Sequence, residues 1–193
     1  MPQKQQPPKL IPPHGGYQDL KSFQMAELVY DGTVKFCERL VSIRSRTYDQ
    51  MVQAARSGKQ NIVEGSMASG TSKKIELKLV GIARASLEEL LQDFHDFLRL
   101  KGFMLWGKEH PLSKTVRGLC YRKDRSYSTY KPYIEKAPPE VAANTMICMI
   151  HQTNYLLDQQ LRALEKDFLE LGGFTERLYR SRTQSRKKSW SKK

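Results

Sequence analysis

Residues 53–98, QAARSGKQNIVEGSMASGTSKKIELKLVGIARASLEELLQDFHDFL, decide the fold because they read as two helices joined by a tight turn. The first helix, expected over 48–68, contains Gly58 and Gly65 among other small residues. Glycine inside a helix costs about 1 kcal/mol relative to alanine, so we expect these positions to allow close approach of neighbouring helices. The second helix is expected over 73–101, between the N-cap Ser72 and the stop at Gly102.

The second helix carries an unusually wide apolar face. One row at spacings of three and four comprises Ile75, Leu79, Ile82, Ser86, Leu90, Phe94 and Phe97, and a neighbouring row comprises Val80, Leu87, Leu91 and Leu98. This face is wider than a single antiparallel partner requires. We therefore expect several neighbours for this helix, and self-association of the chain.

Helical periodicity also extends over 19–45 and 139–171. Asp31-Gly32 interrupts the former, where a kink is possible, and Thr47 is a candidate N-cap for the helix that follows. Asn154 interrupts the apolar row of the last helix, where it could fix register from a buried position or lie at the edge. Residues 103–139 form a long connection with a short helix over 111–121. The sequence thus predicts an all-α fold.

The pattern Gln53-x-x-Arg56-Ser57-x-x-x-Asn61-Ile62-x-Glu64-Gly65, followed by Ala83-Arg84-Ala85-Ser86-Leu87-x-Glu89-Leu90, resembles the signature of the bacterial four-helix bundle protein family. Members were first noticed as products of intervening sequences in large-subunit ribosomal RNA genes, and relatives are accessory proteins of diversity-generating retroelements. The resemblance implies an antiparallel up-and-down four-helix bundle over 19–173. Residues 143–173 resemble the extended, suffix-bearing branch of the family, whereas the connection 103–139 departs from the core pattern.

The signature residues have two possible roles. The set comprises Arg56, Asn61, Glu64, Gly65, Arg84, Ser86 and Glu89. By resemblance, Asn61, Glu64 and Arg84 lie on the signature faces of the two helices. They could form a surface for a nucleic acid or protein partner, or satisfy one another in a buried network in which Glu64 pairs with Arg84.

Charge divides the chain into three parts. The 193 residues carry a formal charge of +13, which suits a polyanionic partner or merely keeps the protein soluble. Residues 1–18 hold five of the nine prolines and predict an extended arm, either a flexible tail or a peptide that docks on a neighbouring subunit. Residues 174–193 contain eight basic residues and one acid, and predict a disordered tail that binds polyanions or only solubilises. Its candidate nucleic-acid contacts are Arg177, Arg180, Arg182, Arg186, Lys187 and Lys188.

The connection 103–139 mixes aromatic and basic residues. Its candidate contacts are Lys114, Arg117, Arg122, Lys123, Arg125, Tyr127 and Tyr130. Rings that stack on bases beside cations that hold phosphates are typical of single-stranded nucleic-acid binding. The alternative, compatible with the first, is an ordered cap that buries its tyrosines on the end of the bundle.

Catalytic chemistry is not indicated. The four histidines are scattered, and Cys148 and His151 alone do not make a metal site. We expect no enzyme activity, metal or cofactor. The dispersed cysteines and the lack of a long apolar run favour a cytoplasmic protein without a membrane span.

These features predict a non-enzymatic, oligomeric adaptor that binds RNA or DNA, with single-stranded or structured RNA as the expected ligand. The family resemblance implies a ring, with a pentamer as the leading form, and a reverse transcriptase as a partner. The alternative is a structural or protein-interaction subunit with no nucleic-acid role.

Overall fold

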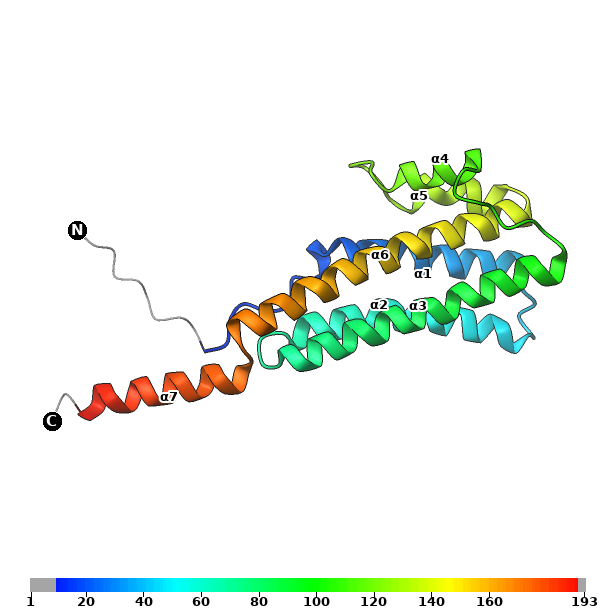
Figure 1. Cartoon of the computed structure of the whole chain (residues 1–193). Coiled ribbons are helices and arrows are strands. Elements are labelled where there is room, and N and C mark those ends of the chain that lie inside the picture. The colour runs from blue at the N-terminus through cyan, green and yellow to red at the C-terminus, as the bar shows by residue number, and fades with distance from the viewer. Residues whose placement is uncertain (1–9, 191–193) are drawn as a thin grey trace.

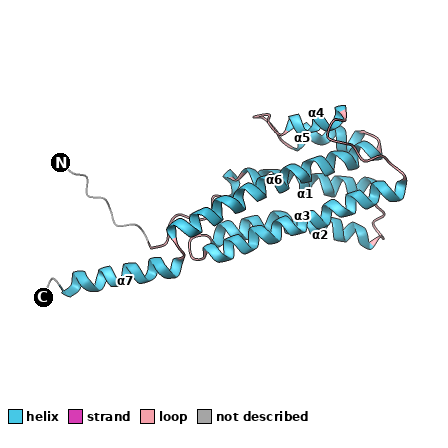
Figure 2. Ribbon diagram, in the orientation of Figure 1, coloured by secondary structure: helices cyan, strands magenta, loops and turns pink. Residues whose placement is uncertain are grey.

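The computed structural model describes residues 10–190, apart from the side chains of Lys188 and Ser189. All regular structure within this range is helical, which confirms the predicted all-α class (Figures 1 and 2). None of the described helices is both long and apolar enough to cross a membrane.

Four long helices make up the body of the molecule: α1 (Lys21–Leu40), α2 (Arg46–Ala68), α3 (Lys73–Lys101) and α6 (Pro139–Leu171). Helix α1 contacts α2 and α6, and α3 contacts the same two helices, so the four form a closed cycle around one core (Figure 1). At the centre the fully buried ring of Phe36 on α1 meets Phe94 and Phe97 of α3 edge-on, at centroid distances of 4.8 and 4.9 Å. Such edge-to-face pairs add to the stability gained from apolar burial.

The connection between α3 and α6 is ordered and lies against α6. It contains α4 (Pro111–Leu119), α5 (Tyr127–Lys131) and the π-helical turn η2 (Pro132–Lys136). Both α4 and η2 contact α6, and α5 and η2 also reach α1. Every residue of α6 from 142 to 150 is therefore buried, because α1 and α3 cover one side of the helix and the insert covers the other.

The helix ends agree with the sequence except between α1 and α2. The Ser72 side chain accepts a hydrogen bond from the Ile75 N–H at 3.2 Å, and Gly102 adopts φ 67°, so both predicted ends of α3 are confirmed. Helix α1 ends at Leu40 rather than near residue 45, and Ser45 rather than Thr47 caps α2. The chain leaves the helix at Val41, which is extended.

The arm folds back on the body where it is described. The Gly15 N–H donates to the Ser66 carbonyl at 3.1 Å, and the Ser66 hydroxyl donates to the Gly15 carbonyl at 2.9 Å. The short helix η1 (Tyr17–Asp19) follows. Residues 10–18 thus contact this chain's own α2; the rest of the predicted arm, 1–9, lies outside the described residues.

The tail differs from the predicted disorder. Residues 174–190 form helix α7 (Phe174–Trp190), which extends beyond the body from the end of α6 (Figure 1). The segment contains neither proline nor glycine, and the Glu176 carboxylate accepts the Gly173 N–H at 2.9 Å at the start of the helix. A carboxylate at a helix N-terminus satisfies an otherwise unpaired donor and favours the helix.

Two glycines explain how closely the helices approach. A methyl group at Gly58 would lie 2.6 Å from Cδ2 of the fully buried Leu87 on α3. A methyl at Gly32 would lie 2.7 Å from the Met146 sulfur of α6. Helix α1 is continuous through Asp31-Gly32, without a break at the glycine. Gly32 allows close packing against α6.

We predict that Gly58→Ala lowers the free energy of unfolding by about 1–2 kcal/mol, because overpacking against Leu87 outweighs the gain in helix propensity. Gly81→Ala on α3 is the matched control. Among the described residues, its new methyl meets no atom within 4 Å beyond the backbone of its own helix, so the variant should gain up to about 1 kcal/mol. Urea unfolding monitored by circular dichroism measures both values; stabilisation by Gly58→Ala would contradict the close contact.

Candidate nucleic-acid interface

One buried side chain fastens the start of the insert to α6. Asn144 is only 1% exposed. Its Oδ1 accepts the Trp106 N–H at 2.8 Å, and its Nδ2 donates to the carbonyls of Met104 and Glu140, each at 2.9 Å. The amide thus satisfies backbone groups of an irregular segment that would otherwise be left unpaired.

A second set of contacts places α4 on the same helix. Val116 is fully buried, and the Ser113 hydroxyl lies 3.7 Å from the Cys148 sulfur. Further along, the Gln152 amide donates to the Arg117 carbonyl at 3.0 Å. These contacts hold α4 beside α6 over about one helical turn.

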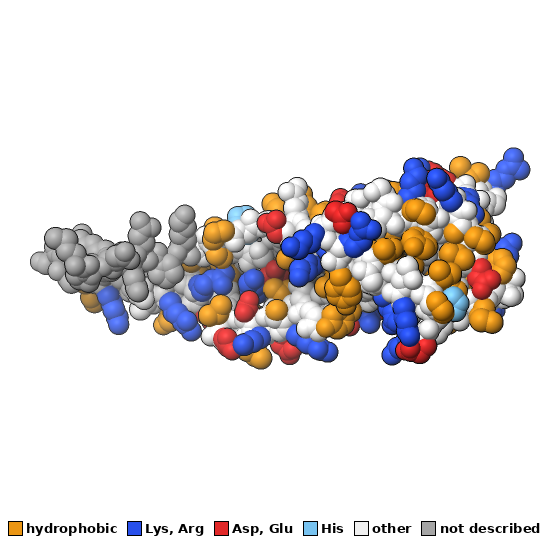
Figure 3. Space-filling model, turned by 90° about the horizontal axis from the view of Figure 1, so that it is seen from above, with side chains coloured by type: hydrophobic (Ala, Val, Ile, Leu, Met, Phe, Trp, Pro, Cys, Tyr) orange, Lys and Arg blue, Asp and Glu red, His pale blue; other side chains and the backbone are white. Residues whose placement is uncertain are grey.

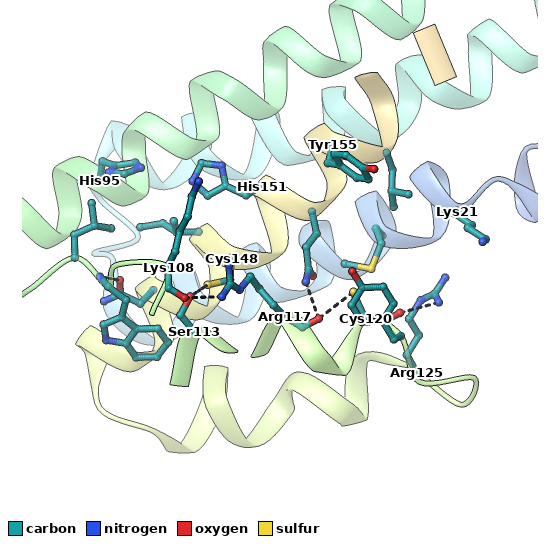
Figure 4. A pocket seen from close by; sticks show the side chains of 18 residues that line it. Lys21, His95, Lys108, Ser113, Arg117, Cys120, Arg125, Cys148, His151 and Tyr155 are labelled. Atoms are coloured by element: carbon teal, nitrogen blue, oxygen red, sulfur yellow. Dashed lines mark hydrogen bonds between the residues drawn. The ribbon is translucent and has the colours of Figure 1, made fainter. Parts of the chain in front are cut away.

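Between these attachments lies a cavity of about 810 Å³, open on one side, between α6, the insert, the C-terminal half of α3 and the start of α1. Figure 4 shows Ser113, Arg117 and Cys120 along α4, facing Cys148, His151 and Tyr155 on α6. The volume lies in the range of small-ligand sites.

The cavity is strongly cationic. Its lining includes Lys21, Lys108, Arg117 and Arg125, and no carboxylate belongs to the lining among the described residues. The two guanidinium groups bond to neutral acceptors: Arg117 donates to the Lys108 carbonyl, and Arg125 donates to the Cys120 carbonyl and the Gln24 amide oxygen. These bonds fix the position of the arginines without neutralising their charge.

The surroundings of His151 lower the pKa of its imidazole, chiefly through burial. Burial lowers its pKa, and the neighbouring His95, Arg84 and Lys108 lower it further, while Glu88 opposes them. The His151 side chain is exposed toward the open cavity, while protein atoms surround its other sides. A cationic imidazole is disfavoured there mainly because it would lose hydration.

The aromatic rings available for stacking are not the predicted ones. Tyr130 is fully buried, which raises its pKa to about 12, so it cannot stack on a base in this structure. Tyr127 is half-buried and donates its hydroxyl to Glu135 at 2.9 Å. Both belong to the cap that the sequence offered as an alternative. The rings that border the cavity are Trp106, Tyr121 and Tyr155.

The predicted insert cations fall into two groups. Lys114 pairs with Glu109 at 2.6 Å and Arg122 pairs with Asp124 at 2.9 Å, so their charges are largely compensated. Lys123 is exposed, away from the cavity lining. Arg117 and Arg125 are the two predicted insert cations that border the cavity.

The tail cations lie on α7, at the end of the molecule remote from the insert (Figure 1). Arg180, Arg182, Arg186 and Lys187 are exposed, and Arg177 is half-buried with its guanidinium 3.5 Å from the Gly70 carbonyl. Lys188 lies on the helix, but its side chain is outside the described part. The structure therefore presents the tail charges along a helix rather than on a disordered chain.

The signature residues do not form the predicted Glu64–Arg84 pair. The Arg84 guanidinium instead bridges Glu88 at 2.9 Å and Asp158 of α6 at 3.0 Å, and the buried Asn154 donates to Glu88 at 3.3 Å. This network joins α3 to α6, and because Arg84 is 35% exposed its electrostatic contribution is modest.

The remaining signature residues occupy α2 and the adjoining face of α3. Arg56 and Glu64 are exposed, Gly65 is buried against α3, and the Asn61 amide donates to the Ser57 carbonyl of its own helix at 2.8 Å. Ser86 and Glu89 border a shallow groove of about 350 Å³ between the two helices. The signature thus combines packing positions with an exposed polar surface.

The candidate contacts predicted from the sequence omit Lys108, Trp106 and Tyr121 of the insert. They also omit Lys21, Tyr155 and His95, which lie on α1, α6 and α3. Nothing in their local sequence distinguishes them from solvated surface residues. They become site residues only because the insert folds over α6 and encloses the space in front of them.

Comparisons of the chain with family models, with curated proteins and with solved structures each return no match.

We predict that Asn144→Ala destabilises the protein by about 2 kcal/mol, because it leaves the Trp106 N–H and the Met104 carbonyl without partners. Asn61→Ala is the matched control: its amide bonds within one turn of α2 at a half-buried site, and the change should stay within about 0.5 kcal/mol. Urea unfolding measures both changes in the free energy of unfolding. Equal changes for the two variants would show that Asn144 does not fasten the insert to α6.

Proposed function

We propose that the protein is a non-enzymatic nucleic-acid-binding adaptor, with single-stranded or structured RNA as its ligand, built as an antiparallel four-helix bundle of the bacterial four-helix bundle family. The single observation that supports this best is the positive cavity: Lys21, Lys108, Arg117 and Arg125 border it together with aromatic rings, and the described part of the chain contributes no carboxylate to the lining. Phosphate attracts such cations, and bases stack on such rings.

The long shape of the molecule supports an adaptor rather than a single-point binder. The insert and α7 lie at opposite ends of the long axis (Figure 1), and Figure 3 shows Lys and Arg side chains scattered over the coloured part of the face viewed from above, with an apolar area among them. Two separated cationic surfaces can hold one strand at two points, which raises its effective affinity. In this proposal the protein acts in the cytoplasm and bridges template RNA and a reverse transcriptase.

We predict that binding of a fluorescently labelled single-stranded RNA weakens at least tenfold between about 50 and 200 mM salt, because phosphate contacts release counterions. A chain ending at Gly173 should bind more weakly and with a shallower dependence on salt, since it lacks α7 and the residues after it.

The control keeps the tail but replaces Arg180, Arg182 and Lys187, all exposed on α7, with glutamine. It should behave like the truncated chain if charge is responsible. Fluorescence anisotropy provides the measurement, and a flat dependence on salt, or no binding by any form, contradicts the proposal.

A second candidate function, a self-associating structural subunit, is favoured by the apolar row on α3. Ile75 and Ile82 are 49% and 39% exposed, and Leu79 between them is half-buried. Spacings of four and three place the three side chains on one face of the helix. A second copy of the chain could cover this face, and a ring such as a pentamer would also concentrate the cationic surfaces.

We predict that Ile82→Glu reduces the mass of the oligomer in solution, because a carboxylate in an apolar contact must be desolvated without a partner. Ile43→Glu is the control, since Ile43 is 80% exposed in the link before α2. Light scattering coupled to size exclusion measures the mass. A wild-type mass of 22.3 kDa would show a monomer and exclude this function.

A further inference from the structure

We propose that the cavity between the insert and α6 is a pocket for one nucleotide unit, an aromatic base that carries a phosphate group. This inference builds on the proposed function and adds the place where a base is held. The unit could be a free nucleotide or part of a strand, because the chemistry that recognises it is the same.

The cations divide between two ends of the cavity. Figure 4 shows Lys108 reaching up beside His151 at one end, and Arg125 and Lys21 at the other, with Tyr155 between them. A phosphate can therefore reach a cationic group while the base remains near the rings. Charge-assisted bonds to phosphate are among the strongest that side chains make.

The rings can enclose a base from different elements. Trp106 comes from the start of the insert and Tyr121 follows α4, whereas Tyr155 lies on α6. His110 stacks on Trp106 at a centroid distance of 4.7 Å and an interplanar angle of 7°, which fixes the orientation of the indole. Tyr121 and Tyr155 are 85% and 63% exposed, so neither is committed to the core.

One polar atom in the lining has no hydrogen-bond partner among the described residues. The Gln152 side-chain amide donates from Nε2 to the Arg117 carbonyl, but its Oε1 is buried without a donor. An unpaired buried acceptor is costly, so Oε1 would gain a hydrogen bond if the side chain turned it toward a donor on a ligand. The exocyclic amino and ring N–H groups of nucleobases are such donors.

The competing explanation is an adventitious gap between the insert and the body. A gap of that kind would be lined by apolar atoms or by balanced charges, because unbalanced charge repels itself and costs stability. The lining contains apolar side chains such as Met25, Ile147 and Leu156, but it also collects four cations, two histidines and three aromatic rings from four parts of the chain. This combination matches a base joined to a phosphate better than it matches an apolar ligand.

The test uses the full-length chain with Trp190→Phe. The sequence has two tryptophans, and Trp190 is 83% exposed on α7, so the variant leaves Trp106 as the only tryptophan reporter in the cavity. Its emission is followed during titration with the four nucleoside 5′-monophosphates, with the matching nucleosides, and with inorganic phosphate. We expect a saturable change with at least one monophosphate, at a concentration at least tenfold lower than for its nucleoside or for phosphate.

Two variants in this background test the residues. Tyr155→Ala and Lys108→Ala should each weaken the response about tenfold, the effect expected for one base stack or one charge-assisted contact. Their matched controls are Tyr179→Ala, on α7, and Lys123→Ala, exposed outside the lining, which should stay within twofold. Equal effects of a variant and its control would overturn the pocket.

The same samples separate this inference from the proposed function when a labelled single-stranded RNA is added. Binding of the strand with no response of Trp106 to any nucleotide or strand overturns the pocket and leaves the function intact. A response to a monophosphate without strand binding supports the pocket as a site for free nucleotides and overturns the function. A response to the strand supports the pocket as a site for one unit within it.

Discussion

The structure depends on the all-round burial of the first half of α6. A helix in a small protein usually keeps one face in water, but residues 142–150 of α6 are buried without interruption. One side meets α1 and α3, and the other meets α4 and η2. The insert therefore belongs to the core, and removing it would expose the apolar residues that now stabilise the protein.

This burial also creates the site. Asn144 supplies hydrogen bonds where irregular backbone crosses a buried helix surface, so the segment around Trp106 can lie against α6 without unpaired groups. From His151 onward the insert covers α6 only in part, and exposed side chains such as His151 and Tyr155 border the cavity. The cavity lies where the two elements diverge. Among the described residues, no carboxylate in the lining balances the charges of Arg117 and Arg125, because these side chains bond to backbone carbonyls and to the Gln24 amide oxygen.

The helical layout could largely be predicted from the sequence. The Ser72 cap, the Gly102 stop and the periodicity of 139–171 gave the limits of α3 and α6, because these signals act within one or two turns of chain. The end of α1 was predicted several residues too late, because the polar residues that follow Leu40 are equally compatible with a continuing helix. The tail was predicted as disordered from its charge, whereas its helix depends on the Glu176 cap and on residues that tolerate a helix.

The sequence by itself determined the all-α class, the close approach at Gly58, and the concentration of charge in residues 174–193, because each follows from local composition or spacing. Only the tertiary structure decided which cations are paired and which rings are accessible. Lys114 and Arg117 lie three residues apart on one short helix, yet one pairs with Glu109 and the other borders the cavity. Charge compensation and accessibility depend on neighbours that folding brings from distant parts of the chain, as it brings Tyr155 and Lys21 to the insert.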